Sequence, residues 1–467
     1  MAPVTREHLA AVLRRRPMAS APALAAELRV SVPTVQRLLR AAGDSVVSRG
    51  RARRTRHAWR RGLRGQAVDV PMYRIDADGL AQPFAALALV APQGSAMAVE
   101  GNDWPLPDAS RDGWWPGLPY LLQDMRPQGY MGRQFARAVH EGLQLPPDPR
   151  GWSDDEVLVA LAHAGADLPG DLIVGEPAMR RWQAGRLNAP EPLAEDGLAQ
   201  AYAALAEQAV AGGAAGSSAA GEFPKFAALR AAPQPDLFEP GGAGRTPHVL
   251  VKFSGAGDTP AERRWADLLL AEHLALQTLS EHGLPAARSR LLAAGGRTFL
   301  EVERFDRHGR WGRSPLVSLE AVNAAFLGLP HRPWPELAAP LARAGLLAEG
   351  AHAAIATLWW FGRLIGNTDM HLGNLSFRPR AGRFALVPAY DMLPMRHAPL
   401  AGGEVPALSL LEPPLPLPDE RAAWLRAARA ALRFWELLMQ DGRASGPMQA
   451  HVDGSAARLR EALGVVG

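Results

Sequence analysis

The residues with the clearest chemical potential lie in the C-terminal third of the chain. Asp369 and Asn374 are separated by four residues, and Asp391 follows the segment 377–384, which predicts a β-hairpin. In this pattern the first carboxylate can accept the proton of a substrate hydroxyl, while the amide and the second carboxylate offer oxygen ligands to Mg²⁺. The spacing alone is weakly specific, but together with strand, turn, strand and aspartate it predicts a phosphotransferase loop.

A lysine and a glutamate farther upstream predict the site that holds the phosphates. Of the 51 basic residues only Lys225 and Lys252 are lysines, and a compact ammonium suits a tight phosphate or carboxylate site. Lys252 lies in the apolar run 248–253, which predicts a buried strand. Glu272 lies on the apolar stripe of a helix predicted over 261–282, where a carboxylate needs a cationic partner. A strand lysine paired with a helix glutamate is how protein kinases hold the α- and β-phosphates; the alternative is a glutamate paired locally with an arginine.

A run of small residues before Lys225 predicts a phosphate-binding loop. Residues 212–221 are rich in Gly, Ala and Ser, and Lys225 closes the run. The backbone N–H groups of such a segment can approach phosphate oxygens closely, because glycine has no side chain. The alternative is a Gly/Ala/Ser linker.

The first 65 residues carry a strong positive charge. Fifteen arginines against three acidic residues give them a net charge of +12, and since the whole chain carries +4, the remainder carries −8. Such an asymmetry favours a polyanion-binding head on an acidic body.

The pattern of this head predicts a winged helix-turn-helix DNA-binding domain. Helical periodicity covers 5–16, 21–28 and 32–41, and an arginine-rich hairpin is predicted over 46–59. The alternative is a three-helix interaction module with a solvated basic tail. The residues expected to contact DNA are Thr34, Gln36 and Arg37 on the recognition helix and Arg49, Arg51, Arg53 and Arg54 in the wing.

The remaining chain divides by pattern into three regions of mixed structure. We expect an α+β region over 66–205, a strand-rich region with the glycine-rich loop over 206–310, and a helical region with the catalytic loop over 311–467. The absence of cysteine excludes disulfides, thiolate metal sites and cysteine nucleophiles. No apolar run is long enough to span a membrane, and the N-terminus carries arginines instead of an apolar signal segment, so a cytoplasmic protein without membrane contact is expected.

Three motifs of the chain resemble a known family. The run Arg304–Arg307, the loop Asn367–Ser376 and the triplet Tyr390–Met392 are similar to motifs of the HipA family of bacterial serine/threonine kinase toxins. The resemblance covers roughly residues 66–440. The added N-terminal helix-turn-helix resembles the YjjJ-type branch, in which DNA-binding and kinase regions share one chain. The resemblance implies a bilobal, protein-kinase-like α+β body that uses ATP and Mg²⁺ to phosphorylate serine or threonine on proteins, with aminoacyl-tRNA synthetases among the family's targets.

The resemblance also implies roles for individual residues. Asp369 matches the catalytic base, Asn374 and Asp391 match the metal ligands, and Lys252 matches the lysine at the ATP phosphates. The segment Glu301–Glu303, with Val302 between them, matches the segment whose backbone receives adenine. The family's loop pattern fits the spacing of Ser218, Gly221 and Lys225. Phe223 and Pro224 depart from it, because the better-known member has polar residues at these positions. The resemblance also implies an autophosphorylated serine, at Ser218 or at its neighbour Ser217.

Two other functions fit part of these observations. One is a DNA-binding transcriptional regulator whose kinase-like body senses nucleotide or mediates assembly, and the other is a small-molecule kinase of the aminoglycoside or choline type. Retention of Lys252, Glu272, Asp369, Asn374 and Asp391 together argues against the first, and the run Arg304–Arg307 argues against the second. The expected partners are operator DNA, a protein substrate and, among assemblies, a homodimer.

Overall fold

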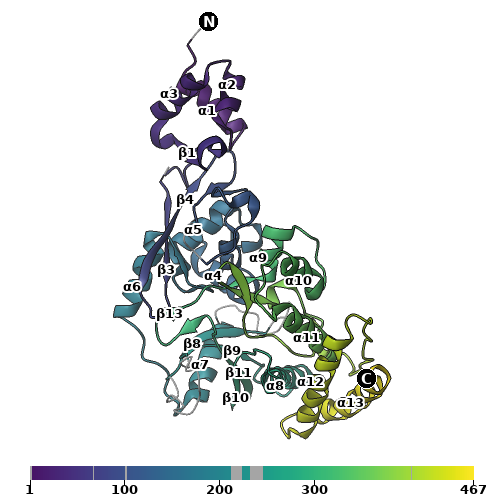
Figure 1. Ribbon diagram of the computed structural model, residues 1–467. Helices are drawn as coiled ribbons and strands as arrows, with labels where there is room; N and C mark the ends of the chain where they lie inside the picture. The colour runs from purple at the N-terminus through teal and green to yellow at the C-terminus, as the bar shows by residue number, and fades with distance from the viewer. Residues whose placement is uncertain (1–2, 67, 100–102, 212–222, 232–245, 401) are drawn as a thin grey trace. The chain divides into compact units, whose positions relative to one another are not determined.

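The computed structural model describes the chain except for residues 1–2, 67, 100–102, 212–222, 232–245 and 401 (Figure 1). The protein is a mixed α+β molecule whose described residues form two compact units. The first unit comprises residues 1–76, 80–127 and 136–189, and the second comprises 77–79, 128–135 and 190–467. The four-part division expected from the sequence stays a prediction.

The N-terminal segment of the first unit consists of three helices and a hairpin. The helices are α1 (Arg6–Arg15), α2 (Ala21–Leu28) and α3 (Val32–Ala42), and β1 (Val46–Arg49) pairs antiparallel with β2 (Arg56–Trp59). Ser20 and Ser31 begin α2 and α3 by accepting hydrogen bonds from the backbone N–H of the third residue after each. Arg29 adopts a left-handed conformation in the turn between the two helices. The helices and hairpin expected from the sequence are therefore present, around a small core that includes Leu9, Leu13, Leu24 and Val35.

The remainder of the first unit is built on an antiparallel sheet. Its strand order is β6-β5-β4-β3-β7. The strands are β3 (Val70–Ile75), β4 (Ala81–Leu89), β5 (Ser95–Ala96), β6 (Trp114–Trp115) and β7 (Leu172–Val174). The helices α5 (Asp154–Ala164) and α6 (Glu176–Leu187) pack beside β7. Residues of α4 (Gly129–Val139) are divided between the two units, with the division after residue 135.

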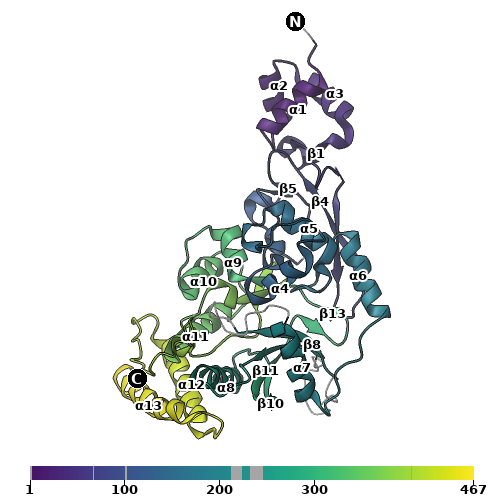
Figure 2. The same ribbon diagram turned by 180° about the vertical axis from the view of Figure 1, so that it is seen from behind.

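The second unit begins with a four-stranded antiparallel sheet between two helices. The strand order is β10-β11-β9-β8, with β8 (Lys225–Leu229), β9 (His248–Phe253), β10 (Ser289–Ala294) and β11 (Arg297–Glu303). Because side chains alternate along a strand, each face of the sheet has its own core. Helix α7 (Leu198–Ala211) covers one face and α8 (Pro260–Glu281) covers the other (Figures 1 and 2).

Helix α8 lies within one residue of the range 261–282 expected from the sequence. Thr259 and Glu262 form a reciprocal capping box, and Pro260 occupies the first helical position, where its missing N–H costs nothing. Gly283, with φ of +71°, follows the C-terminus. The helix therefore spans 22 residues and brings its middle, where Glu272 lies, under the sheet.

The rest of the second unit is mainly helical. Two short sheets contain β12 (Arg307–His308) with β13 (Gly312–Arg313), and β14 (Val317–Ser318) with β15 (Ser376–Arg380) and β16 (Arg383–Leu386). The helices are α9 (Leu319–Val322), α10 (Trp334–Arg343), α11 (Ala351–Leu364), α12 (Arg421–Gln440) and α13 (Gly446–Val466). Helix α12 packs against α8, α11 and α13, so it joins the C-terminal helices to the helix under the sheet. Residues 411–417 form neither helix nor strand.

Among the described helices, none combines the length and apolar character needed to cross a membrane.

Candidate active site

The predicted contact between the strand lysine and the helix glutamate is present. Lys252 Nζ on β9 lies 2.7 Å from both Oε1 and Oε2 of Glu272 on α8. Lys252 is 6% exposed and Glu272 is fully buried. Burial raises the pKa of Glu272 above its ordinary value. Burial would lower the pKa of Lys252, but the nearby Asp391 and the ion pair with Glu272 keep it above its ordinary value. The ammonium therefore stays charged inside the protein.

The two lysines of the chain are direct neighbours across two strands. Lys225 on β8 stands opposite Lys252 in the antiparallel register, so their side chains share one face of the sheet. Like charges in this position repel each other unless anionic groups lie near. Glu272 and Asp391 supply that charge: both carboxylates contact the Lys252 ammonium, and Lys225 acts with Lys252 to hold the pKa of Asp391 low although burial would raise it. The sequence showed that both lysines were unusual but not that they meet, since the pairing depends on the register of β8 and β9.

Asp391 joins this cluster from a distant part of the chain. Its carboxylate contacts Lys252 Nζ, and this ammonium lowers the pKa of Asp391 to about 2 although burial by itself would raise it. Its backbone has φ of +53°, a left-handed conformation in which aspartate is enriched among non-glycine residues. Asn367 Nδ2 donates to the Asp391 carbonyl at 3.1 Å and fixes the backbone there. A strained conformation at a charged cluster is typical of functional sites.

The loop that carries Asp369 is held by its own amides. Helix α11 ends before it, and Asn367 Oδ1 accepts a hydrogen bond from the Asp369 N–H at 3.0 Å. Asn374 Nδ2 donates to the Asp369 carbonyl at 2.8 Å. Asn374 is 7% exposed, whereas the Asp369 side chain is exposed to solvent. The loop thus presents the predicted base at the surface and holds the predicted metal ligand inside.

The loop packs against the helix that precedes it. A side chain at Gly362 of α11 would place its Cβ 2.4 Å from the Met370 sulfur, so the end of the Met370 side chain would have to move. The backbone N–H of Asn367 also donates to the Gly362 carbonyl at 2.8 Å. The loop is thus tied by its backbone to the end of α11, and Met370 packs on Gly362.

Asn374 and Asp391 fit a magnesium ion by their chemistry. Mg²⁺ prefers hard oxygen ligands and is usually held by one or two protein groups with phosphate and water in the other positions. The amide nitrogen of Asn374 is used by the Asp369 carbonyl, so its Oδ1 is left to act as a ligand. The Asp391 carboxylate is ionised at neutral pH because its pKa is low. Each group can thus offer an oxygen to the metal.

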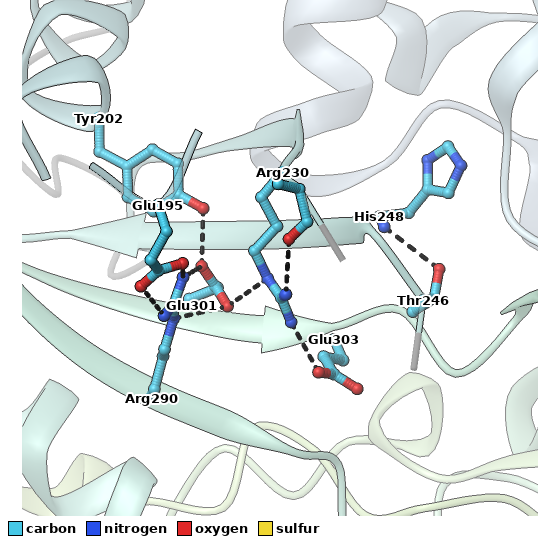
Figure 3. A network of polar contacts seen from close by, with 9 residues as sticks. Glu195, Tyr202, Arg230, Thr246, His248, Arg290, Glu301 and Glu303 are labelled. Carbon is cyan, nitrogen blue, oxygen red and sulfur yellow. Dashed lines mark hydrogen bonds and ion pairs between the residues drawn. The ribbon is translucent and has the colours of Figure 1, made fainter. Parts of the chain in front are cut away.

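The segment Glu301–Glu303 lies on β11, and the Glu301 side chain points to the face covered by α7. Figure 3 shows its carboxylate among Tyr202, Arg230 and Arg290. Tyr202 donates to it at 2.7 Å, Arg230 Nε lies 2.8 Å from it and Arg290 Nε lies 3.0 Å from it. Glu303 in turn accepts from Arg230 at 2.7 Å. These carboxylates therefore stabilise the sheet from the face opposite Lys252, and adenine binding by the backbone of Glu301, Val302 and Glu303 stays a prediction.

The run Arg304–Arg307 forms a compact ion cluster. Asp306 accepts from Arg304 Nη2 at 3.1 Å and from Arg307 Nη1 at 2.5 Å, and all three side chains are largely buried. Arg378 on β15 donates to the Phe305 carbonyl at 2.9 Å. The motif thus ties the end of the four-stranded sheet to the strand that follows the catalytic loop.

Three residues of the expected phosphate-binding loop, Ser217, Ser218 and Gly221, lie outside the described residues. Just after them, Phe223 is buried with its ring centroid 4.6 Å from that of Trp265 on α8. Its ring centroid also lies 5.9 Å from Lys252 Nζ. Phe223, the first described residue after the loop, therefore packs against α8, the helix that carries Glu272.

The predicted DNA-contacting residues lie on α3 and on the hairpin. Gln36, Arg37, Arg51, Arg53 and Arg54 are exposed, and Thr34 and Arg49 are half-buried. Thr34 Oγ1 bonds to the Ser31 hydroxyl at 3.0 Å, so it also supports the start of α3.

Several other arginines of this segment are used internally. Arg16 pairs with Glu27 at 3.2 Å, and Arg61 makes a two-pronged contact with Asp155 at 2.6 and 2.7 Å. Arg6 and Arg14 lie over the ring of Trp59. By contrast, α3 and the hairpin contain arginines and no acidic residue, so both elements carry only positive charge.

Comparison with known proteins agrees with this arrangement. Residues 66–183 match the family model described as "YjjJ-like toxin, middle domain", and residues 217–444 match the "HipA-like C-terminal domain". The chain is 40% identical to Toxin YjjJ of Escherichia coli (strain K12) over 427 residues, which cover 91% of each chain. The chain therefore belongs to the HipA-like toxins, in the YjjJ branch, as its motifs indicated.

A solved structure extends the likeness to the fold. The HipA chain of a Shewanella oneidensis MR-1 toxin–antitoxin complex with HipB and operator DNA matches with a TM-score of 0.51 and 16% identity, covering 85% of this chain and 98% of that one. At this identity the match speaks for the fold alone.

Proposed function

We propose that this protein transfers the γ-phosphoryl group of Mg·ATP to a serine or threonine hydroxyl of another protein. One observation carries the proposal: Lys252, Glu272 and Asp391, which are far apart in the sequence, meet in one cluster in which the lysine and the glutamate are buried and the aspartate is partly exposed. Such a cluster is what phosphoryl transfer requires, because the reaction depends mainly on positioning and on charge stabilisation.

Each group has a role that its surroundings support. Lys252, oriented by Glu272, neutralises phosphate charge, and Lys225 adds a second ammonium on the same face. Asn374 and Asp391 hold the magnesium ion, which supplies charge neutralisation at the phosphates. Before nucleotide binds, Asp391 contacts Lys252, so nucleotide binding must exchange this ion pair for contacts to metal and phosphate. Asp369, exposed at the loop, accepts the proton of the incoming hydroxyl.

A radiolabelled ATP assay tests the proposal. The wild-type protein should label a protein in a bacterial lysate, and Asp369→Ala should lower the rate of transfer by about 10²- to 10⁴-fold while nucleotide binding persists. The exposed Asp108→Ala, in the first unit, is the matched control and should behave as wild type. Transfer at the wild-type rate by Asp369→Ala would overturn the assignment of the base. Labelling of small molecules without any labelled protein would favour a small-molecule kinase.

We also propose that residues 1–65 bind DNA as a winged helix-turn-helix domain, with the protein's own operator as the expected site. The exposed arginines of α3 and the hairpin support this proposal because they are placed to contact phosphates. The HipA structure contains operator DNA and HipB, which makes an antitoxin protein a candidate partner here too. Gel-shift titrations of intact protein and of a chain lacking residues 1–65 test it. Equal DNA affinity of the two chains would refute the proposal.

Autophosphorylation at Ser218 or Ser217 is proposed as the control of this activity. A phosphate on this loop adds about −1.5 to −2 charges, which would repel the triphosphate of ATP, so the modified enzyme should be inactive. Mass spectrometry after incubation with ATP should find the phosphate in wild type but not in Asp369→Ala. A loop that stays unmodified while other proteins are labelled would contradict this control.

A further inference from the structure

The hydroxyl of Tyr390 joins two parts of the candidate active site. Tyr390 lies directly before Asp391, and its hydroxyl donates to the Gly373 carbonyl at 2.6 Å. The same oxygen lies 2.7 Å from the Ser376 hydroxyl at the start of β15. Its ring packs against that of Phe305, with centroids 5.7 Å apart.

These contacts surround the other metal-binding residue. Gly373 and Ser376 lie on either side of Asn374, and the Gly373 carbonyl belongs to the peptide group that ends in the Asn374 nitrogen. A hydrogen bond to that carbonyl fixes the plane of this peptide and thereby the direction in which the Asn374 backbone leaves the loop. Asn374 Nδ2 is fixed separately by the Asp369 carbonyl. One phenolic hydroxyl, on the residue next to Asp391, thus helps to fix the backbone at Asn374.

We propose that Tyr390 is a positioning residue that holds Asn374 and Asp391 at the separation needed for one magnesium ion. The inference rests on the proposed phosphoryl transfer and deepens it. Tyr390 acts through its hydroxyl on the Gly373 peptide, while its ring serves packing against Phe305. A metal site built from only two protein ligands depends on such support, because the ligands bind well only if their geometry exists before the ion arrives.

The substitution Tyr390→Phe removes the hydroxyl and keeps the ring. Binding of a fluorescent ATP analogue is measured over a series of Mg²⁺ concentrations and also without the metal. The Mg²⁺ concentration at half-saturation should rise by about 3- to 30-fold, the cost of one or two lost hydrogen bonds. Nucleotide affinity without metal should stay as in wild type, because Gly373 and Ser376, which the hydroxyl contacts, flank the predicted metal ligand Asn374 and are not among the residues predicted to hold ATP.

The control removes an equivalent hydroxyl elsewhere. Tyr120 of the first unit is buried and donates to the Pro105 carbonyl at 2.8 Å, so Tyr120→Phe also loses one bond to a backbone carbonyl. The two variants should have similar thermal midpoints, but only Tyr390→Phe should change the Mg²⁺ dependence. Ser376→Ala, which removes the hydroxyl that contacts the phenol, should shift the Mg²⁺ dependence in the same direction by less. It serves in place of Tyr390→Phe should that variant fail to fold.

The outcomes separate this inference from the proposed function. An unchanged Mg²⁺ dependence in Tyr390→Phe, or an equal loss of nucleotide affinity with and without the metal, would overturn the positioning role. A wild-type protein that binds no nucleotide in the presence of Mg²⁺ would instead refute the proposed phosphoryl transfer itself.

Discussion

Replacing Glu272 by glutamine should destabilise the protein far more than the same change at the surface. Glu272 is fully buried, and both of its carboxylate oxygens lie 2.7 Å from Lys252 Nζ. Removing one partner of a buried ion pair costs about 3–5 kcal/mol, because the other charge is left buried. Asp391 still contacts Lys252 in the variant, and glutamine keeps one acceptor oxygen. We therefore expect a loss of about 2–3 kcal/mol, below the full cost.

Urea unfolding of matched variants measures this loss. Glu281→Gln is the control, since Glu281 lies at the end of the same helix and makes an exposed pair with Arg433 at 3.4 Å; exposed pairs contribute about 0–1 kcal/mol. A double variant, Lys252→Met with Glu272→Leu, should recover part of the loss because two apolar side chains leave no buried charge in the pair. If Glu272→Gln and Glu281→Gln had the same free energy of unfolding, the Lys252 charge would not depend on Glu272 for its stabilisation, and the reasoning would be refuted.

Two further predictions follow from other charged groups. His397 is buried in contact with the ring of His451, near Arg264 and Arg396, and burial lowers its pKa from 6.5 to about 3. Between these two pH values the unfolded chain binds a proton at this histidine that the folded protein does not, so the free energy of unfolding should fall as the pH drops from about 6.5 towards 3. The urea midpoint, plotted against pH, should have a flatter slope in His397→Gln. A variant of an exposed histidine should keep the wild-type slope. For DNA binding, Arg53→Ala should reduce the slope of log affinity against log salt by about 0.9 for each lost phosphate contact. The control is Arg332→Ala, which removes the same charge from an exposed side chain of the second unit and should leave the slope unchanged. Equal slopes for Arg53→Ala and Arg332→Ala would contradict the role of the hairpin.

The amino-acid sequence was enough to predict the elements that carry the site. The apolar run around Lys252 and the apolar stripe around Glu272 are patterns among near neighbours, so their strand and helix could be recognised locally. The spacing of Asp369 and Asn374 is also local, because Asn374 bonds to the backbone of the same short loop. The family followed from such motifs, and the comparisons confirmed it.

The tertiary structure decided which of these residues meet. Lys225 faces Lys252 only because β8 and β9 pair in one register, and a shift of one residue would place them on opposite faces of the sheet. Lys252 reaches Asp391 across 139 positions of sequence, a contact set by the packing of strand, helix and loop and by no local pattern. The same holds for the Tyr390 hydroxyl, whose partners flank Asn374 in another segment. Periodicity and capping act over one or two turns, whereas the contacts that hold metal and phosphate groups arise between segments that only the folded chain brings together.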